Sequence, residues 1–218
     1  AGHPVIPLPF EEPDDLGALF FHWELAIAVA GAVLGINPFD QPNVQEAKDL
    51  TNATIAAFER DGAFPADDDA AVPADAAPEE LGRLLDAAQR GAYVATLAYL
   101  APSPELDRAL ERLRLAIRRR TGAATTVGYG PRYLHSTGQL HKGGPATGVF
   151  VQLVDDGTPG VAVPGARYDF ATLVRAQAIG DGRALRTRGL PFLRVKVTGE
   201  AARDIEALAA AIEREGAP

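Results

Sequence analysis

Short apolar runs alternate with longer amphipathic segments along most of the chain. Apolar runs rich in β-branched and aromatic residues predict buried strands, and these runs lie at 92–100, 123–128, 147–155 and 192–197. The segments between them predict helices at 78–89, 105–120, 169–178 and 200–214, with a short helix within 131–142 and a further piece at 181–188. Strands that alternate with helices indicate an α/β fold, in which a mostly parallel sheet lies between layers of helices.

The first part of the chain follows a different pattern. A short strand is predicted at 4–8, and a helix that is apolar on almost all sides is predicted at 14–35. That helix is long enough to cross a membrane, but His22 and Glu24 lie inside it and no basic residues flank it. We therefore interpret it as the buried helix of a soluble protein, in which the Glu24 carboxylate requires a partner.

A second helix is predicted over about 40–60, with Asp40 as its cap. Gln41 and Lys48 lie seven positions apart on this helix, so they share one face. Seven residues of helix span about 10.5 Å, a reach that suits two groups at opposite ends of one ligand. On the residues alone, a solvated helix face is the simpler interpretation.

Composition divides the chain into three parts. Residues 62–78 are rich in Ala, Pro and Asp and lack periodicity, which predicts a surface linker. The linker separates an N-terminal part at 1–61 from an α/β domain at 79–218. The length of 218 residues suits one α/β domain with an appendage. Because the chain contains no Met, we expect it to be a fragment of a longer polypeptide.

The charge and the cysteine content exclude several classes of partner and chemistry. The formal net charge is −8, so we expect no nucleic-acid partner and no anionic membrane surface. An anionic ligand would therefore need a local basic pocket. The absence of Cys excludes disulfides and thiolate chemistry and is typical of a cytoplasmic protein.

A basic pocket of this kind is predicted in the glycine-rich segment 128–146, which follows a strand. Backbone N–H groups and hydroxyls in such a segment can bind an anion. The candidate binding residues are Arg132, His135, Ser136, Thr137, His141 and Lys142. The two histidines lack the i, i+4 spacing of helical metal ligands, and no carboxylate lies among these residues, so we predict no metal site. The alternative is a glycine-rich connector whose polar residues satisfy its turns.

The segment from Pro13 to Lys48 resembles the C-terminal signature of the phosphoglucose isomerase family. The family pattern runs roughly P-x-x-L-G-A-L, a glutamate, a glycine, I-N-x-F-D-Q, a valine and a lysine. It is matched in register by Pro13, Leu16, Gly17, Ala18, Leu19, Glu24, Gly31, Ile36, Asn37, Phe39, Asp40, Gln41, Val44 and Lys48. The stretches FFHWELAIAVAGAVLGINPFDQPNVQEAK and GYGPRYLHSTGQLHKGGPATGVF also resemble the isomerase part of bacterial transaldolase–phosphoglucose isomerase fusion proteins.

The resemblance implies an aldose–ketose isomerase of glycolysis and gluconeogenesis. Such an enzyme interconverts glucose 6-phosphate and fructose 6-phosphate through an enediolate, and it needs no metal or redox cofactor. Gln41 would help to hold the hexose phosphate, and Lys48 would be the catalytic group near the ring oxygen and the carbonyl. The family fold implies that 1–61 ends a sugar-isomerase (SIS) domain, and that 79–218 forms an SIS-like domain with three Rossmann-like layers.

The family takes its catalytic base from a glutamate in a glycine-rich loop, but no glutamate lies between Thr121 and Gly199. We therefore expect the isolated chain to be inactive and to need the rest of an isomerase or transaldolase polypeptide. Two alternatives remain open: a non-catalytic module that binds hexose phosphate through 128–146, and a scaffold. The apolar helix must pack on 79–215, on a second copy or on nothing, so a homodimer is a further candidate.

Overall fold

The computed structural model describes residues 5–40, 42–66, 70–88, 91–155, 157 and 160–215. The chain divides into two compact units, Ala1–Gln41 and Pro42–Pro218. Each unit is described by itself.

The first unit is built on one helix, α1 (Asp15–Leu34). The helix ends at Gly35, whose φ of 69° is the left-handed conformation that glycine adopts most readily. Within α1 only Gly31 is buried, where it lies against Pro38. The helix predicted at 14–35 is therefore present, but its apolar side chains are exposed and so is Glu24. The predicted strand at 4–8 is wrong for its described part, since 5–8 form no regular structure.

Among the described residues, α1 alone is long and apolar enough to cross a membrane. The core helix of a soluble protein or a signal sequence meets the same criteria.

The second unit contains a sheet of five parallel strands in the order β1-β5-β4-β2-β3. The strands are β1 (Val72–Pro73), β2 (Tyr93–Tyr99), β3 (Ala124–Tyr129), β4 (Gly148–Val154) and β5 (Phe192–Lys196). β2 and β4, in the interior of the sheet, are almost completely buried, as expected where helices cover both faces. The path reverses at β2, because the chain moves outward to β3 and then returns to β4 on the other side of β2.

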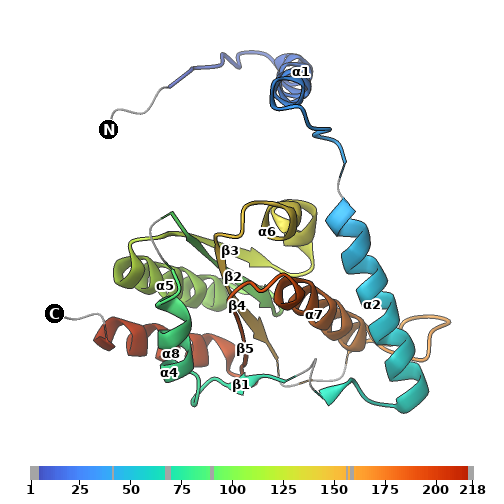
Figure 1. The fold of residues 1–218 in the computed structure, drawn as a ribbon, viewed down its shortest axis with the longest axis vertical. Helices are drawn as coiled ribbons and strands as arrows, with labels where there is room; N and C mark the ends of the chain where they lie inside the picture. The colour runs from blue at the N-terminus through green and yellow to red at the C-terminus, as the bar shows by residue number, and fades with distance from the viewer. Residues whose placement is uncertain are drawn as a thin grey trace. The chain divides into compact units, whose positions relative to one another are not determined.

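Helices cover both faces of this sheet (Figure 1). One face packs against α4 (Pro78–Leu85), α5 (Pro104–Thr121) and α8 (Ala201–Glu215), with a core that includes Leu110, Leu113 and Ile205. The other face packs against α7 (Phe170–Thr187), through a smaller core that includes Phe150 and Leu185. The predicted α/β fold with three Rossmann-like layers is thus confirmed.

A further helix, α2 (Pro42–Asp61), packs alongside α7 (Figure 1). The two helices approach closely at Gly180, where an added Cβ would lie 3.0 Å from Thr51 Oγ1 and 3.1 Å from its backbone nitrogen. Arg188 also donates to Glu46 at 2.5 Å, and this hydrogen bond lowers the pKa of Glu46. The compact second unit therefore includes α2 and starts at Pro42.

Some elements differ from their predicted extents. Residues 62–78 contain the edge strand β1, and Ala74 and Ala77 are buried. The two helical pieces predicted at 169–178 and 181–188 form the single helix α7. The short helix predicted within 131–142 is a 3-10 turn, η1 (Arg132–His135), followed by α6 (Gly138–Gly143).

Candidate binding pocket

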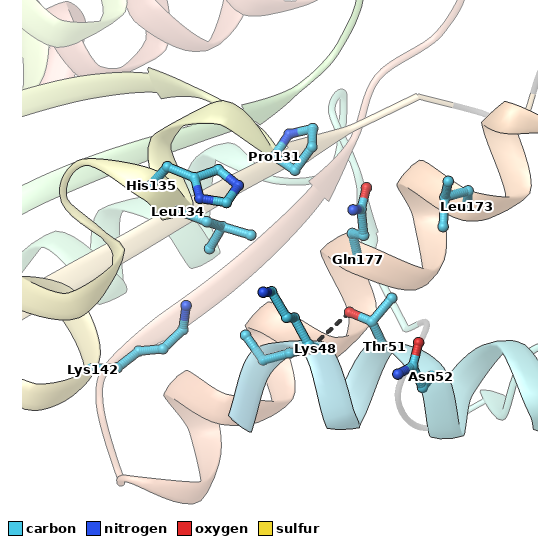
Figure 2. Close-up of a pocket in the computed structure, with 10 residues that line it drawn as sticks. Lys48, Thr51, Asn52, Pro131, Leu134, His135, Lys142, Leu173 and Gln177 are labelled. Atoms are coloured by element: carbon cyan, nitrogen blue, oxygen red, sulfur yellow. Dashed lines mark hydrogen bonds between the residues drawn. The ribbon is translucent and has the colours of Figure 1, made fainter. Parts of the chain in front are cut away.

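A pocket with a cavity volume of about 220 Å³ lies between α2, η1, α6 and α7 (Figure 2). Its lining residues are Ala47, Lys48, Thr51, Asn52, Pro131, Leu134, His135, Lys142, Leu173 and Gln177. The lining combines an apolar wall with two ammonium groups, an imidazole, a hydroxyl and two amides. Pockets for drug-sized ligands span about 300–1,000 Å³, so this one suits a small polar ligand or one end of a larger ligand.

Lys48 reaches the pocket from α2. Thr51 Oγ1 donates back to the Ala47 carbonyl at 2.8 Å, one turn earlier in the same helix. Figure 2 shows the Lys48 and Lys142 side chains extending toward the space beneath His135 and Leu134. Lys48 is exposed to solvent, so its ammonium remains accessible to a ligand. Gln41, which was predicted to act with Lys48, lies outside the described residues.

Lys142 reaches the same pocket from α6, but in a different environment. Its side chain is only 2% exposed, and its ammonium forms an ion pair with Oδ1 of Asp181, which is 1% exposed. Asp181 lies on α7, at the close approach to α2. A buried charge without a partner is strongly unfavourable. The Lys142 ammonium and the Asp181 carboxylate therefore compensate each other's buried charge.

Two tyrosines continue this buried polar network. The Tyr133 hydroxyl donates to Asp181 Oδ2. Because Tyr133 uses its one hydroxyl proton on Asp181, the Tyr99 hydroxyl must be the donor in its 3.3 Å contact with the Tyr133 oxygen. Burial and the nearby Asp181 carboxylate raise the pKa of both tyrosines well above the usual value. The tyrosines therefore remain protonated. Tyr133 anchors Oδ2 of Asp181, while Oδ1 faces Lys142.

His141 lies in the core and does not line this pocket. Its Nδ1 is 2.9 Å from the Tyr93 hydroxyl, and its ring packs edge-on against Phe150. Burial lowers the pKa of His141 to about 4. A neutral imidazole at this position contributes no positive charge to an anion site at neutral pH.

The other residues predicted in 128–146 divide between the pocket and the surface. His135 lines the pocket at the end of η1. Arg132 is exposed, with its guanidinium 5.6 Å from the centre of the Tyr129 ring. Ser136 donates to the Tyr133 carbonyl at 3.1 Å, and Thr137 precedes α6 without a capping hydrogen bond from its side chain. Arg132, Ser136 and Thr137 are not among the residues that line the pocket.

Sequence reasoning missed the parts of the site that α7 supplies, Gln177 and Asp181. The available signal was a carboxylate between Gly180 and Gly182, just after the apolar pair Ala178 and Ile179. An aspartate that is buried must find a partner, and the nearby segment 128–146 offered a lysine.

A second hollow, with a volume of about 540 Å³, lies beyond the carboxyl ends of β2, β4 and β5. Ligands commonly bind at this edge of an open α/β sheet, where the strand order reverses. The charged side chains that line it are Asp155, Glu200 and Arg203, two carboxylates against one cation. An anionic ligand is therefore less favoured in this hollow than in the pocket lined by Lys48 and Lys142.

Comparison with known proteins gives short matches. No family model matches the chain. The glucose-6-phosphate isomerase of Exiguobacterium sibiricum is 49% identical over 44 residues, which are 20% of this chain and 10% of that protein. The glucose-6-phosphate isomerase of Heliobacterium modesticaldum is 46% identical over 44 residues, 20% of this chain and 10% of that protein. The glucose-6-phosphate isomerase of Leptospira interrogans is 38% identical over 65 residues, 28% of this chain and 15% of that protein.

Part of this chain is similar to glucose-6-phosphate isomerases. The similarity is local, and the matches span only 10–15% of the length of the curated relatives named above. Among solved structures, a hypothetical protein from Thermus thermophilus superposes with a TM-score of 0.49 at 15% identity, covering 81% of this chain and 45% of that one.

Proposed function

We propose that this chain is part of a glucose-6-phosphate isomerase, and that the pocket between α2, η1, α6 and α7 binds the hexose phosphate. The observation that carries the proposal is that Lys48 lines the same pocket as His135 and Lys142. The local similarity to glucose-6-phosphate isomerases supports it. The cytoplasm, the compartment of phosphorylated sugars, is the location that we propose.

The chemistry of the lining suits a phosphorylated sugar. Ammonium groups stabilise a phosphate or a developing enediolate as compact positive charges. The Asn52 and Gln177 amides and the Thr51 hydroxyl can bind sugar hydroxyls as donors or acceptors. In this proposal Lys48, the accessible cation, lies near the carbonyl end of the sugar and balances the charge that forms when a proton moves between C2 and C1.

The proton transfer requires a general base within hydrogen-bond reach of the substrate. Among the described residues that line the pocket, none is a carboxylate. Asp181 lies behind Lys142 and is occupied by the ammonium and by Tyr133. We therefore propose that the base comes from a part of an isomerase or transaldolase fusion outside the described pocket. Gln41 of this chain stays a predicted substrate-binding residue. Residues 1–218 alone should show little isomerase turnover in a coupled assay.

The absence of a carboxylate among the described lining residues favours a second candidate function, a non-catalytic module that binds hexose phosphate. A pocket with two ammonium groups and no carboxylate in its lining can bind an anion without transforming it. The two candidates differ when the chain is joined to its longer polypeptide. If the chain supplies the catalytic Lys48, Lys48→Met should abolish turnover of the whole protein. If it is a module, the variant should change binding and leave turnover intact.

Isothermal titration with fructose 6-phosphate tests the binding proposal directly. Lys48→Met should weaken the affinity by about tenfold or more, because a charge-assisted hydrogen bond to a phosphate or enolate oxygen contributes about 1.5–3 kcal/mol. Lys196→Met is the matched control, since Lys196 is exposed on β5 and does not line the pocket. Equal affinities in the wild type and in both variants would contradict the proposal.

A further inference from the structure

We infer that Asp181 is a positioning residue that holds the Lys142 ammonium at the floor of the binding pocket. This inference rests on the proposed function, since it concerns the same pocket. Asp181 does not line the pocket, and it contacts the pocket through Lys142. Its role would therefore be to fix the direction of a cation that contacts the ligand.

The two carboxylate oxygens of Asp181 contact different partners. Oδ2 accepts the Tyr133 hydroxyl, and Tyr99 supports Tyr133 in turn. Oδ1 faces the Lys142 ammonium. The tyrosines therefore fix the carboxylate, and the carboxylate fixes the lysine.

The lysine retains donors for a ligand. An ammonium group has three N–H donors, and Asp181 is its one hydrogen-bonding or ion-pair partner among the described residues. Lys142 lines the pocket while its side chain is 2% exposed. We infer that the remaining donors face the pocket, and little rotamer freedom is left to be lost on binding.

Removal of the Asp181 carboxylate should change anion affinity in opposite directions, depending on whether Asp181 positions Lys142 or acts only through its negative charge. The negative charge of Asp181 lies beside the place where a phosphate would bind, so by Coulomb's law alone it weakens anion binding. Asp181→Asn would then strengthen binding. If Asp181 positions Lys142, the same substitution releases the ammonium and weakens binding, although it removes a negative charge.

A double-mutant cycle on the full chain tests this inference, with fructose 6-phosphate as the titrated ligand. Asp181→Asn should weaken the affinity about tenfold, and Lys142→Met at least as much. The double variant should bind no more weakly than Lys142→Met, within about twofold, because Asp181 would act only through Lys142. Tyr133→Phe, which keeps both charges, should weaken binding about twofold to fivefold. Circular dichroism and the thermal midpoint of each variant identify any that fail to fold.

The outcomes separate the two proposals. If Lys142→Met weakens binding but Asp181→Asn and Tyr133→Phe bind as tightly as the wild type or tighter, the inference about Asp181 is wrong and the binding pocket stands. Additive losses from the two single substitutions would show that Asp181 acts on the fold rather than on Lys142. If the wild type does not bind fructose 6-phosphate, both proposals are overturned.

Discussion

His141 is a buried imidazole whose protonation should affect the stability of the second unit. Its Nδ1 contacts the Tyr93 hydroxyl, and its ring lies against Phe150. Burial lowers its pKa to about 4 from an ordinary value of 6.5. Between these two values the unfolded chain binds a proton that the folded chain excludes, so stability rises with pH.

Acidification from pH 6.5 to pH 4 should therefore destabilise the protein through His141. The expected contribution of this residue is at most about 3 kcal/mol, because one pKa unit corresponds to 1.36 kcal/mol. Chemical denaturation of the wild type and of His141→Gln over this range measures it. The variant should lose less stability on acidification than the wild type. Identical slopes would show that His141 does not titrate with a lowered pKa.

Individual site residues differed in how far the sequence could predict them. His135 and Lys142 belong to a polar, glycine-rich segment, where charged side chains are visible as candidates. Lys48 lies on a predicted helix and became a candidate through the family resemblance. Asp181 was hidden because its role depends on the packing of α7 against Tyr133 and Lys142, which no local pattern encodes. His141 was predicted with the binding residues, but the structure places it in the core.

At the scale of elements, the packing of α2 on α7 brings Lys48 to the pocket. The two helices meet at Gly180, where an added Cβ would lie 3.0 Å from Thr51 Oγ1. Glycine disfavours a helix interior by about 1 kcal/mol, so its presence here is explained by the close approach.

Gly180→Val should push α2 away from α7. We expect a loss of about 1–3 kcal/mol in the free energy of unfolding, as for other overpacked contacts. Fructose 6-phosphate affinity should fall as well, because Lys48 moves with α2. Gly17→Ala is a suitable control, since an added Cβ at this helical glycine meets nothing within 4 Å. Unchanged affinity and stability in Gly180→Val would show that the helices do not depend on this contact.

The strength of the local sequence pattern explains which elements could be predicted from the sequence. The strands β2 to β5 and the helices α5 and α8 were predicted because buried parallel strands form continuous apolar runs and the helices are amphipathic. α7 was divided into two pieces because Gly180 and Gly182 interrupt the helical signal. β1 is only two residues long and contains a proline, so it has too little pattern to detect.

In the molecule as a whole, the large apolar side chains of α1 form an exposed surface. Phe20, Phe21 and Trp23 are each at least 60% exposed. Large exposed apolar surfaces mark interaction sites or cause aggregation. A second copy of the chain and the rest of a longer polypeptide remain the two candidate partners.

We predict that residues 1–218 associate in solution and that the second unit alone, residues 42–218, is monomeric. The physical reason is that removal of α1 removes the apolar surface. Analytical ultracentrifugation at several concentrations measures both species. A monomeric full chain at all concentrations would contradict self-association through α1.

We propose that Lys48 and Lys142 bind one phosphorylated hexose in one pocket. The most direct test is a crystal structure of residues 1–218 with fructose 6-phosphate bound. We expect sugar-phosphate oxygens within about 3 Å of both ammonium groups, the usual length of a charge-assisted hydrogen bond. A ligand bound instead in the hollow beyond β2, β4 and β5, with Lys48 and Lys142 both free of it, would contradict the account.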